Sequence, residues 1–252
     1  MNQQHTNAPE GKLYLVSTPI GNLEDITLRA LRILKEADMV AAEDTRRTKH
    51  LLDHFQIGTK LMSYHAFNEH RKTSEIIGMV REGRSVAMVS DAGTPGIADP
   101  GFLLAREARK EGIEPIVIPG VSSLTFTVTA AGLPCEKFAF YGFLPVKSGR
   151  RLAALRAIAA EDKSVLLFES PHRIAKLLNE IVSEIGPGVP LAIIREATKI
   201  HEEVLRGTAA ELRESCEGRN WKGEIVVMLS SQTEEIIENQ DDSEGCNFGN
   251  EA

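Results

Sequence analysis

The segment Ser90–Gly101 has the residue types and length that suit a ligand-binding loop. It contains three glycines, two prolines and two aspartates, follows the apolar run Val86–Val89 and precedes a helical pattern that begins at Phe102. In open α/β sheets, ligands bind beyond the carboxyl ends of strands, where glycines let the backbone approach a ligand closely. Its twelve residues are also many for a plain strand-to-helix turn. The sequence therefore predicts a small-molecule pocket at this loop.

Acidic and basic side chains occur together in three further loops, each directly after an apolar strand. These loops are Glu43–Arg47, Glu169–Arg173 and Arg195–Lys199. Because the carboxyl ends of parallel strands lie at one edge of a sheet, we expect the charges to converge on one cleft. The alternative is that they form helix caps and surface ion pairs. Three such loops favour a functional site over that alternative.

Two pairs of histidines lie close together in the sequence, and each could bind a ligand. His50 and His54 stand at positions i and i+4, a spacing that can chelate zinc on a helix, but the flanking bases disfavour a cation and no metal is expected. His65 and His70 lie in Ser63–His70, which is dense in aromatic and hydrogen-bonding groups. That mixture suits a nucleobase site as well as it suits an ordinary surface loop.

Several common site motifs are absent. The first strand is followed by Ser17–Gly21, which lacks the Gly-x-Gly-x-x-Gly spacing of dinucleotide-binding folds. Gly96 and Gly101 have P-loop spacing, but Phe102 stands where a P-loop has lysine. Gly120-Val121-Ser122-Ser123-Leu124 lacks the final glycine of a nucleophile elbow, which disfavours a serine hydrolase.

Composition indicates a globular protein of the cytoplasm. A hydrophobic content of 42% over 252 residues suffices for one large domain or two ordinary ones. The three cysteines are widely spaced and form no Cys-x-x-Cys pair, so neither a disulfide framework nor a cysteine zinc site is indicated. No apolar run has the length of a membrane span, and residues 1–11 do not resemble a signal peptide.

The net charge of -7 is concentrated at one end of the chain. Residues 231–252 hold seven acids and no Lys or Arg, so the rest of the chain carries 29 acids and 29 bases. We predict that this segment is disordered and dispensable for folding. The neutral remainder neither excludes nor favours an RNA partner.

Strands alternate with helices along the whole chain, which predicts mostly parallel α/β sheets. We expect an N-terminal α/β domain at 12–123, a C-terminal α/β domain at 124–230 and the acidic tail at 231–252. The expected strands are Leu13–Ser17, Met39–Ala42, Val86–Val89, Glu114–Ile118, Phe138–Gly142, Ser164–Phe168, Leu191–Ile194 and Ile225–Leu229. The expected helices are Leu23–Ala37, a helix that follows Glu43–Arg47 and ends at Phe55, Arg71–Glu82, Phe102–Glu111, Leu152–Ala160, Ile174–Ile185 and Ala209–Glu214.

These motifs together resemble the tetrapyrrole methylase superfamily, most closely its branch that 2′-O-methylates a cytidine of 16S ribosomal RNA in the 30S subunit. Each matching segment is short, but their number and order are specific. They are Ser17–Leu23, Ala42–Arg46, Ser90–Pro95, Pro119-Gly120, Ala131–Pro134, Gly142–Pro145, Glu169–Arg173 and Arg195–Lys199. The resemblance implies two α/β domains with S-adenosylmethionine in the cleft between them, and a homodimer. It also implies cofactor contacts from Ile20, Gly93, Thr94, Ile97, Ser122, Ser123, Phe168, Arg195 and Glu224.

Methyl transfer to a ribose hydroxyl needs alignment and a proton acceptor. Positioning can supply up to about 7 to 11 kcal/mol, and a carboxylate or neutral amine can accept the proton late in the reaction. Lys199, Glu43 and Asp44 are the candidate acceptors. Arg46, Arg47 and Lys49 are the candidate RNA-phosphate contacts. Two other functions stay open: methylation of a tetrapyrrole or other small molecule on the same fold, and binding of the cofactor without catalysis.

Overall fold

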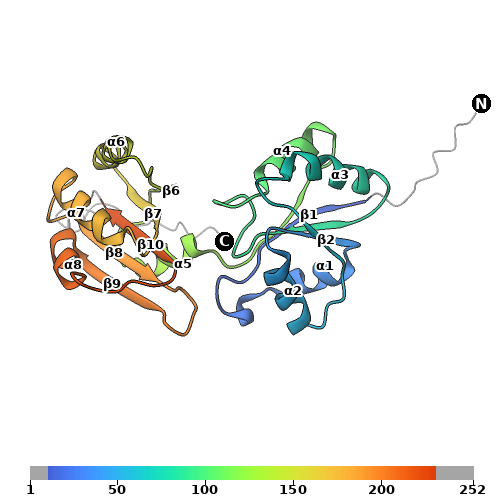
Figure 1. Cartoon of the computed structure of the whole chain (residues 1–252), viewed down its shortest axis with the longest axis horizontal. Coiled ribbons are helices and arrows are strands. Elements are labelled where there is room, and N and C mark those ends of the chain that lie inside the picture. The colour runs from blue at the N-terminus through green and yellow to red at the C-terminus, as the bar shows by residue number, and fades with distance from the viewer. Residues whose placement is uncertain (1–10, 231–252) are drawn as a thin grey trace, which may run out of the picture. The chain divides into compact units, whose positions relative to one another are not determined.

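The computed structural model describes residues 11–230, which divide into two compact units between Ser123 and Leu124 (Figure 1). Each unit has its own sheet and its own core. The acidic segment 231–252 lies outside the described residues.

The first unit is a parallel sheet with the strand order β3-β2-β4-β1-β5. Because every pair is parallel, the carboxyl ends of its strands lie at one edge. Its strands are β1 (Leu13–Val16), β2 (Met39–Ala42), β3 (Leu61–Ser63), β4 (Val86–Val89) and β5 (Ile116–Ile118). Its helices are the 3-10 turn η1 (Leu23–Asp25), α1 (Leu28–Glu36), α2 (Thr45–His54), α3 (Glu69–Arg81) and α4 (Phe102–Lys110).

Alternation along the strands of the first unit builds a core on each face of the sheet. Val40, Ala87 and Val89 pack with α1 and α2 on one face, and Val86 and Met88 pack with α3 and α4 on the other. Figure 1 shows these two helix pairs on opposite faces. Burial on both faces explains why the strands are continuous apolar runs.

The second unit has a mixed sheet with the order β6-β7-β10-β8-β9. Only the pair β6·β7 is parallel, while β10 is antiparallel to β7 and β8, and β9 is antiparallel to β8. The expectation of a mostly parallel sheet is therefore wrong for this unit. Its strands are β6 (Phe138–Phe143), β7 (Ser164–Glu169), β8 (Pro190–Arg195), β9 (Glu203–Thr208) and β10 (Ile225–Ser230). Its helices are α5 (Ser123–Ala131), α6 (Ser148–Ala159), α7 (Ile174–Glu184) and α8 (Ala209–Ser215).

The core of the second unit also has two faces. Val165, Leu167 and Val227 pack with α6, α7 and α8, whereas Leu166 and Met228 face α5. The strands β7 and β8 are both antiparallel to β10, so their carboxyl ends and the start of β10 share one edge. That edge carries two of the three charged loops predicted from the sequence.

Several elements differ from the sequence-based expectations. The predicted helix over Leu23–Ala37 is divided, because Thr27 caps α1 by accepting a hydrogen bond from the Ala30 amide at 3.1 Å. The strand predicted at Glu114–Ile118 begins only at Ile116. The strands β3 and β9 and the helix α5 were not predicted from the sequence. Within residues 11–230, no helix has both the length and the apolar content to cross a membrane.

Candidate functional site

The loops that follow β1 and β4 are joined by backbone and hydroxyl hydrogen bonds. The Thr18 amide donates to the Gly93 carbonyl at 2.9 Å, and the Gly93 amide donates to the Thr18 carbonyl at 3.1 Å. The hydroxyls of Ser17 and Thr94 lie 3.0 Å apart. The twelve-residue loop is thus fixed against the first strand at the carboxyl edge of the sheet.

Two glycines permit close approaches at this edge. Gly93 has φ +77°, and a Cβ atom there would lie 3.3 Å from Ile20 Cγ2 and 3.9 Å from the Val121 carbonyl oxygen. A Cβ atom on Gly120 would lie 2.9 Å from the Ser17 Cβ. The loops after β1, β4 and β5 therefore converge around Gly93; a side chain at Gly120 would require Ser17 to shift, and one at Gly93 would crowd Ile20 in a backbone conformation that favours glycine.

The structure brings the cofactor-contact candidates of the first unit to this junction. Ile20 is buried, and its Cγ2 atom lies 3.3 Å from the place that a Cβ atom on Gly93 would occupy. Thr94 contacts the β1 loop, and Ile97 follows as a half-buried residue whose amide donates to the Thr94 carbonyl at 3.3 Å. The remaining two, Ser122 and Ser123, are half-buried and lie between the end of β5 and the body of α5.

Glu43 stands directly after β2 at the same edge and has an unusual environment. Its Oε2 atom is buried and has no hydrogen-bond partner within residues 11–230. Burial raises the pKa of Glu43, and the nearby Asp91 carboxylate raises it further, against smaller opposing effects of Arg47 and His65. A buried carboxylate oxygen without a partner, with a raised pKa, has the properties of a proton acceptor.

Asp44 and the basic residues that follow it are engaged in local contacts. Asp44 is the N-cap of α2: its Oδ1 accepts from the Arg46 amide at 2.9 Å, and its carboxylate pairs with the Arg46 guanidinium at 2.7 Å. Those hydrogen bonds hold the pKa of Asp44 well below its usual range. Asp91 accepts from the Asp44 amide at 2.8 Å and lies 3.8 Å from Arg47 Nε. Asp44 is thus a helix cap and a weak base.

The basic face of α2 borders the same edge. Arg47 and His50 line a small pocket together with Thr18, Ser90 and Asp91 from the β1 and β4 loops. Lys49, also on α2, forms an ion pair with its i+4 neighbour on the helix surface. Within residues 11–230, no group of three or more His, Cys, Asp or Glu side chains is placed to hold a metal ion.

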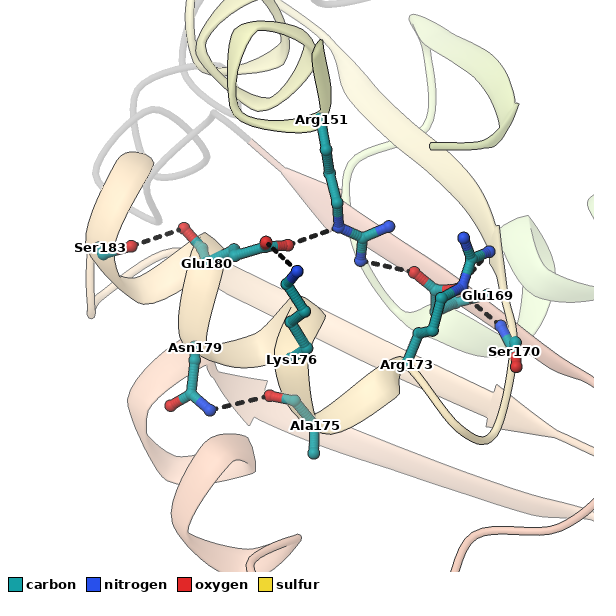
Figure 2. A network of polar contacts seen from close by, with 9 residues as sticks. All are labelled: Arg151, Glu169, Ser170, Arg173, Ala175, Lys176, Asn179, Glu180 and Ser183. Atoms are coloured by element: carbon teal, nitrogen blue, oxygen red, sulfur yellow. Dashed lines mark hydrogen bonds and ion pairs between the residues drawn. The ribbon is translucent and has the colours of Figure 1, made fainter. Parts of the chain in front are cut away.

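The loop Glu169–Arg173 belongs to a buried ion network rather than to an open site. Figure 2 shows the Arg151 guanidinium between Glu169 and Glu180, with Arg173 on the other side of Glu169. Arg151 Nη2 lies 2.7 Å from Glu169 Oε2, and Arg173 Nη2 lies 2.8 Å from Glu169 Oε1. The side chains of Arg151 and Glu169 are 2% and 0% exposed. These charges join α6, β7 and α7, so the loop carries buried ion pairs and not the surface ion pairs of the alternative.

The candidates of the second unit gather at the shared edge of β7, β8 and β10. Phe168 pairs with Val226, Arg195 pairs with Ile225, and Glu224 directly precedes β10. Phe168 is half-buried beside the rings of Phe140 and Phe143. Arg195 Nε donates to the Lys222 carbonyl at 2.8 Å, which fixes the guanidinium at the end of β8.

Lys199 is held between two carboxylates at this edge. Its Nζ lies 2.9 Å from Glu196 Oε1 and 3.0 Å from Glu224 Oε2. Burial lowers the pKa of Lys199, but the two hydrogen bonds outweigh it and raise that pKa above its usual value. The amine is therefore protonated at neutral pH. An ammonium group paired with two carboxylates has no free lone pair with which to accept a proton.

Comparison with known sequences shows the family of this chain. Residues 12–213 match the model of the tetrapyrrole (corrin/porphyrin) methylases. The chain belongs to the tetrapyrrole methylase family. Among its relatives, the protein named ribosomal RNA small subunit methyltransferase I of Halalkalibacterium halodurans is 46% identical over 90% of this chain and 78% of its own length. The protein of that name from Thermotoga maritima is 45% identical over 88% of this chain and 99% of its own.

Solved structures share the tetrapyrrole methylase fold. The uroporphyrin-III C-methyltransferase of Thermus thermophilus has a TM-score of 0.62 and 26% identity, covering 88% of this chain and 94% of that one. A structure that carries the same enzyme name and organism, at 21% identity with a TM-score of 0.62 and coverage of 87% and 97%, is a complex with S-adenosylhomocysteine. Diphthine synthase, at 20% identity, has a TM-score of 0.64 over 87% of this chain and 90% of its own.

Asp91 contacts the candidate residues at the edge of the first sheet but was not among the residues predicted from the sequence. It bonds the Asp44 amide, lies near Arg47 and raises the pKa of Glu43. The available signal was its position, because it is an acid two residues beyond the last residue of a buried strand. Its contacts join residues 47 positions apart in the chain, which spacing alone does not reveal.

Proposed function

We propose that this chain is an S-adenosylmethionine-dependent methyltransferase that methylates the 2′-hydroxyl of a cytidine ribose in 16S ribosomal RNA. The observation that carries the proposal is the identity of 42–46% along 86–90% of the chain to relatives named ribosomal RNA small subunit methyltransferase I. The resemblance to that branch also supports a homodimer that acts in the cytoplasm on the 30S subunit.

The residues at the two sheet edges fit the cofactor. The first unit offers backbone close to Gly93 and hydroxyls at Thr94, Ser122 and Ser123, and the second offers the ring of Phe168 and the charges of Arg195 and Glu224. Backbone amides, hydroxyls and an aromatic ring suit the amino acid and adenosine parts of the ligand. Ile20 and Ile97 add apolar contacts. When bound, the sulfonium supplies an already activated methyl group.

Among the candidate proton acceptors, Glu43 is the one that the geometry favours. Asp44 caps α2 and its pKa is lowered, while Lys199 is an ion-paired cation. Glu43 has a buried oxygen without a partner and a raised pKa. We propose that Glu43 accepts the ribose hydroxyl proton, and that Asp91 positions it by holding the Asp44 amide. Arg46, Arg47 and Lys49 on α2 are the proposed contacts to RNA phosphates.

A methyl-transfer assay with three acceptors tests the proposal. Purified protein and S-adenosylmethionine labelled in its methyl group are incubated separately with 30S subunits, with free 16S ribosomal RNA and with uroporphyrinogen III. We expect label in the RNA and none in the porphyrinogen, and a large loss of transfer in Glu43→Gln. Label in the porphyrinogen alone supports the small-molecule alternative. Cofactor binding without transfer to any acceptor supports the noncatalytic one.

A further inference from the structure

The loop that follows β3, residues 64–68, lies beside the proposed proton acceptor. Ala42, the last residue of β2, pairs with Ser63, the last residue of β3, and the Tyr64 amide donates to the Ala42 carbonyl at 2.8 Å. Glu43 therefore starts one loop, and Tyr64 starts its neighbour at the same edge. Adjacent strands are about 4.8 Å apart, so a nucleotide next to the modified one is within reach of this loop.

The loop is held in one conformation by its own polar contacts. Asn68 Oδ1 accepts from the His65 amide at 2.9 Å, and Asn68 Nδ2 donates to the Ser63 carbonyl at 3.3 Å. Tyr64 is fully buried, and its hydroxyl is 3.0 Å from Thr73 Oγ1. On this fixed loop the Phe67 side chain is 99% exposed. An exposed aromatic ring on a loop whose backbone is already fixed is a surface on which an unpaired base can stack without ordering the loop.

His65 and Glu43 have unused hydrogen-bonding atoms. Asn68 Nδ2 lies 3.2 Å from His65 Nε2 and is a donor, so Nε2 is the accepting ring atom of this hydrogen bond and Nδ1 is the ring atom left to donate. Among the described residues, neither that Nδ1 atom nor Oε2 of Glu43 has a partner, and both atoms are buried. Buried polar atoms normally have partners. One donor and one acceptor from neighbouring loops therefore point to a polar ligand at this edge.

We propose that residues 64–68 bind an unpaired nucleotide flanking the modified cytidine, with Phe67 stacked on its base and His65 hydrogen-bonded to it. This inference rests on the proposed RNA methyltransferase function. RNA is favoured over other occupants because the basic residues of α2 begin directly after Glu43-Asp44. Cationic side chains on α2 and the aromatic ring of Phe67 are therefore both near Glu43. Single-stranded RNA is recognised by this combination of stacked aromatic rings and cationic side chains.

Substitutions of Phe67 that separate stacking from apolar contact test the proposal. Stacking of a base on an aromatic ring predicts that Phe67→Leu raises the KM for 30S subunits by about 5- to 100-fold. Phe67→Tyr keeps the ring, so its KM stays within about twofold of the wild-type value. Neither variant changes the affinity for S-adenosylmethionine or the melting temperature. Leu28→Ala, a change at another exposed apolar side chain of the first unit (85% exposed), leaves the KM unchanged.

Three results overturn the inference, and they are distinguishable. If wild-type protein methylates 30S subunits and Phe67→Leu has the same KM, the loop does not stack on the RNA while the methyltransferase function stands. A retained KM in Phe67→Leu together with a raised KM in Leu28→Ala places the RNA elsewhere on the unit. If wild-type protein transfers no methyl group to RNA, the proposed function fails and this inference fails with it.

Discussion

Replacing Arg151 by methionine separates a structural role of the Glu169–Arg173 loop from a role in the site. The Arg151 guanidinium bonds two carboxylates, Glu169 and Glu180, whose side chains are 0% and 11% exposed (Figure 2). Removing one partner of a buried ion pair costs about 3 to 5 kcal/mol, because the remaining charge is left buried without compensation.

The contacts that survive the substitution set the magnitude. Glu169 keeps Arg173 at 2.8 Å and the Ser170 amide at 2.7 Å, while the one ion pair that Glu180 keeps within residues 11–230 is with Lys176 at 3.7 Å. We therefore expect Arg151→Met to lower the free energy of unfolding by about 3 kcal/mol, the lower end of that range. This corresponds to a fall in melting temperature of roughly 6 to 12 °C.

The assay is thermal unfolding followed by circular dichroism, beside calorimetric measurement of S-adenosylmethionine affinity. Arg156→Met is the matched control, because Arg156 is also on α6 and pairs with Glu184 at 2.7 Å, but its side chain is 66% exposed. An exposed pair contributes about 0 to 1 kcal/mol, so this variant should unfold near the wild-type temperature. Equal melting temperatures for the two variants would refute the structural role. A stable Arg151→Met protein that has lost cofactor affinity would return the loop to the site.

Three further predictions concern the first unit. Methyl transfer should fall as the pH decreases through the raised pKa of Glu43, because the protonated carboxyl cannot accept a proton. Asp91→Asn removes a negative charge that raises this pKa, so the acidic limb of the pH–rate profile should move to lower pH. A limb that does not move excludes Glu43 as the acceptor. Gly93→Val should weaken cofactor binding and cost about 1 to 3 kcal/mol of stability because φ is +77°; calorimetry that finds unchanged affinity in a folded variant places the cofactor elsewhere. Arg46→Ala with Arg47→Ala should weaken binding to 30S subunits and flatten its salt dependence at unchanged cofactor affinity; intact binding at moderate salt would reduce both arginines to surface ion pairs.

The sequence predicted elements well where one signal dominated. Val86–Val89 and Met39–Ala42 are buried on both faces, so uninterrupted apolar runs marked them correctly. The helix α5 went unassigned because Ser-Leu-Thr-Phe-Thr-Val-Thr-Ala-Ala lacks helical periodicity and is rich in β-branched residues. The edge strand β9 contains Arg206 and Gly207 and shows no clean alternation.

Contacts between residues distant in sequence decided what could be known of the site. The composition of Ser90–Gly101 marked a binding loop, but the pairing of Asp91 with the Asp44 amide appears only in the fold. In the sequence, Glu43 and Glu169 look alike, because each is an acidic residue directly after a predicted apolar strand. The first has an oxygen without a partner, whereas the second is bound by two arginines and a backbone amide. Burial and partners, rather than residue type, distinguish the two roles.

The most direct test of the proposed chemistry is the alkali resistance of the methylated RNA. A methyl group on a ribose 2′-oxygen blocks attack on the adjacent phosphodiester, so alkaline hydrolysis leaves the labelled nucleotide in a dinucleotide. After transfer from labelled S-adenosylmethionine to 30S subunits, the account predicts that the label is recovered in one alkali-resistant dinucleotide whose 5′ residue is cytidine. Label recovered in mononucleotides would place the methyl group on a base and contradict the account.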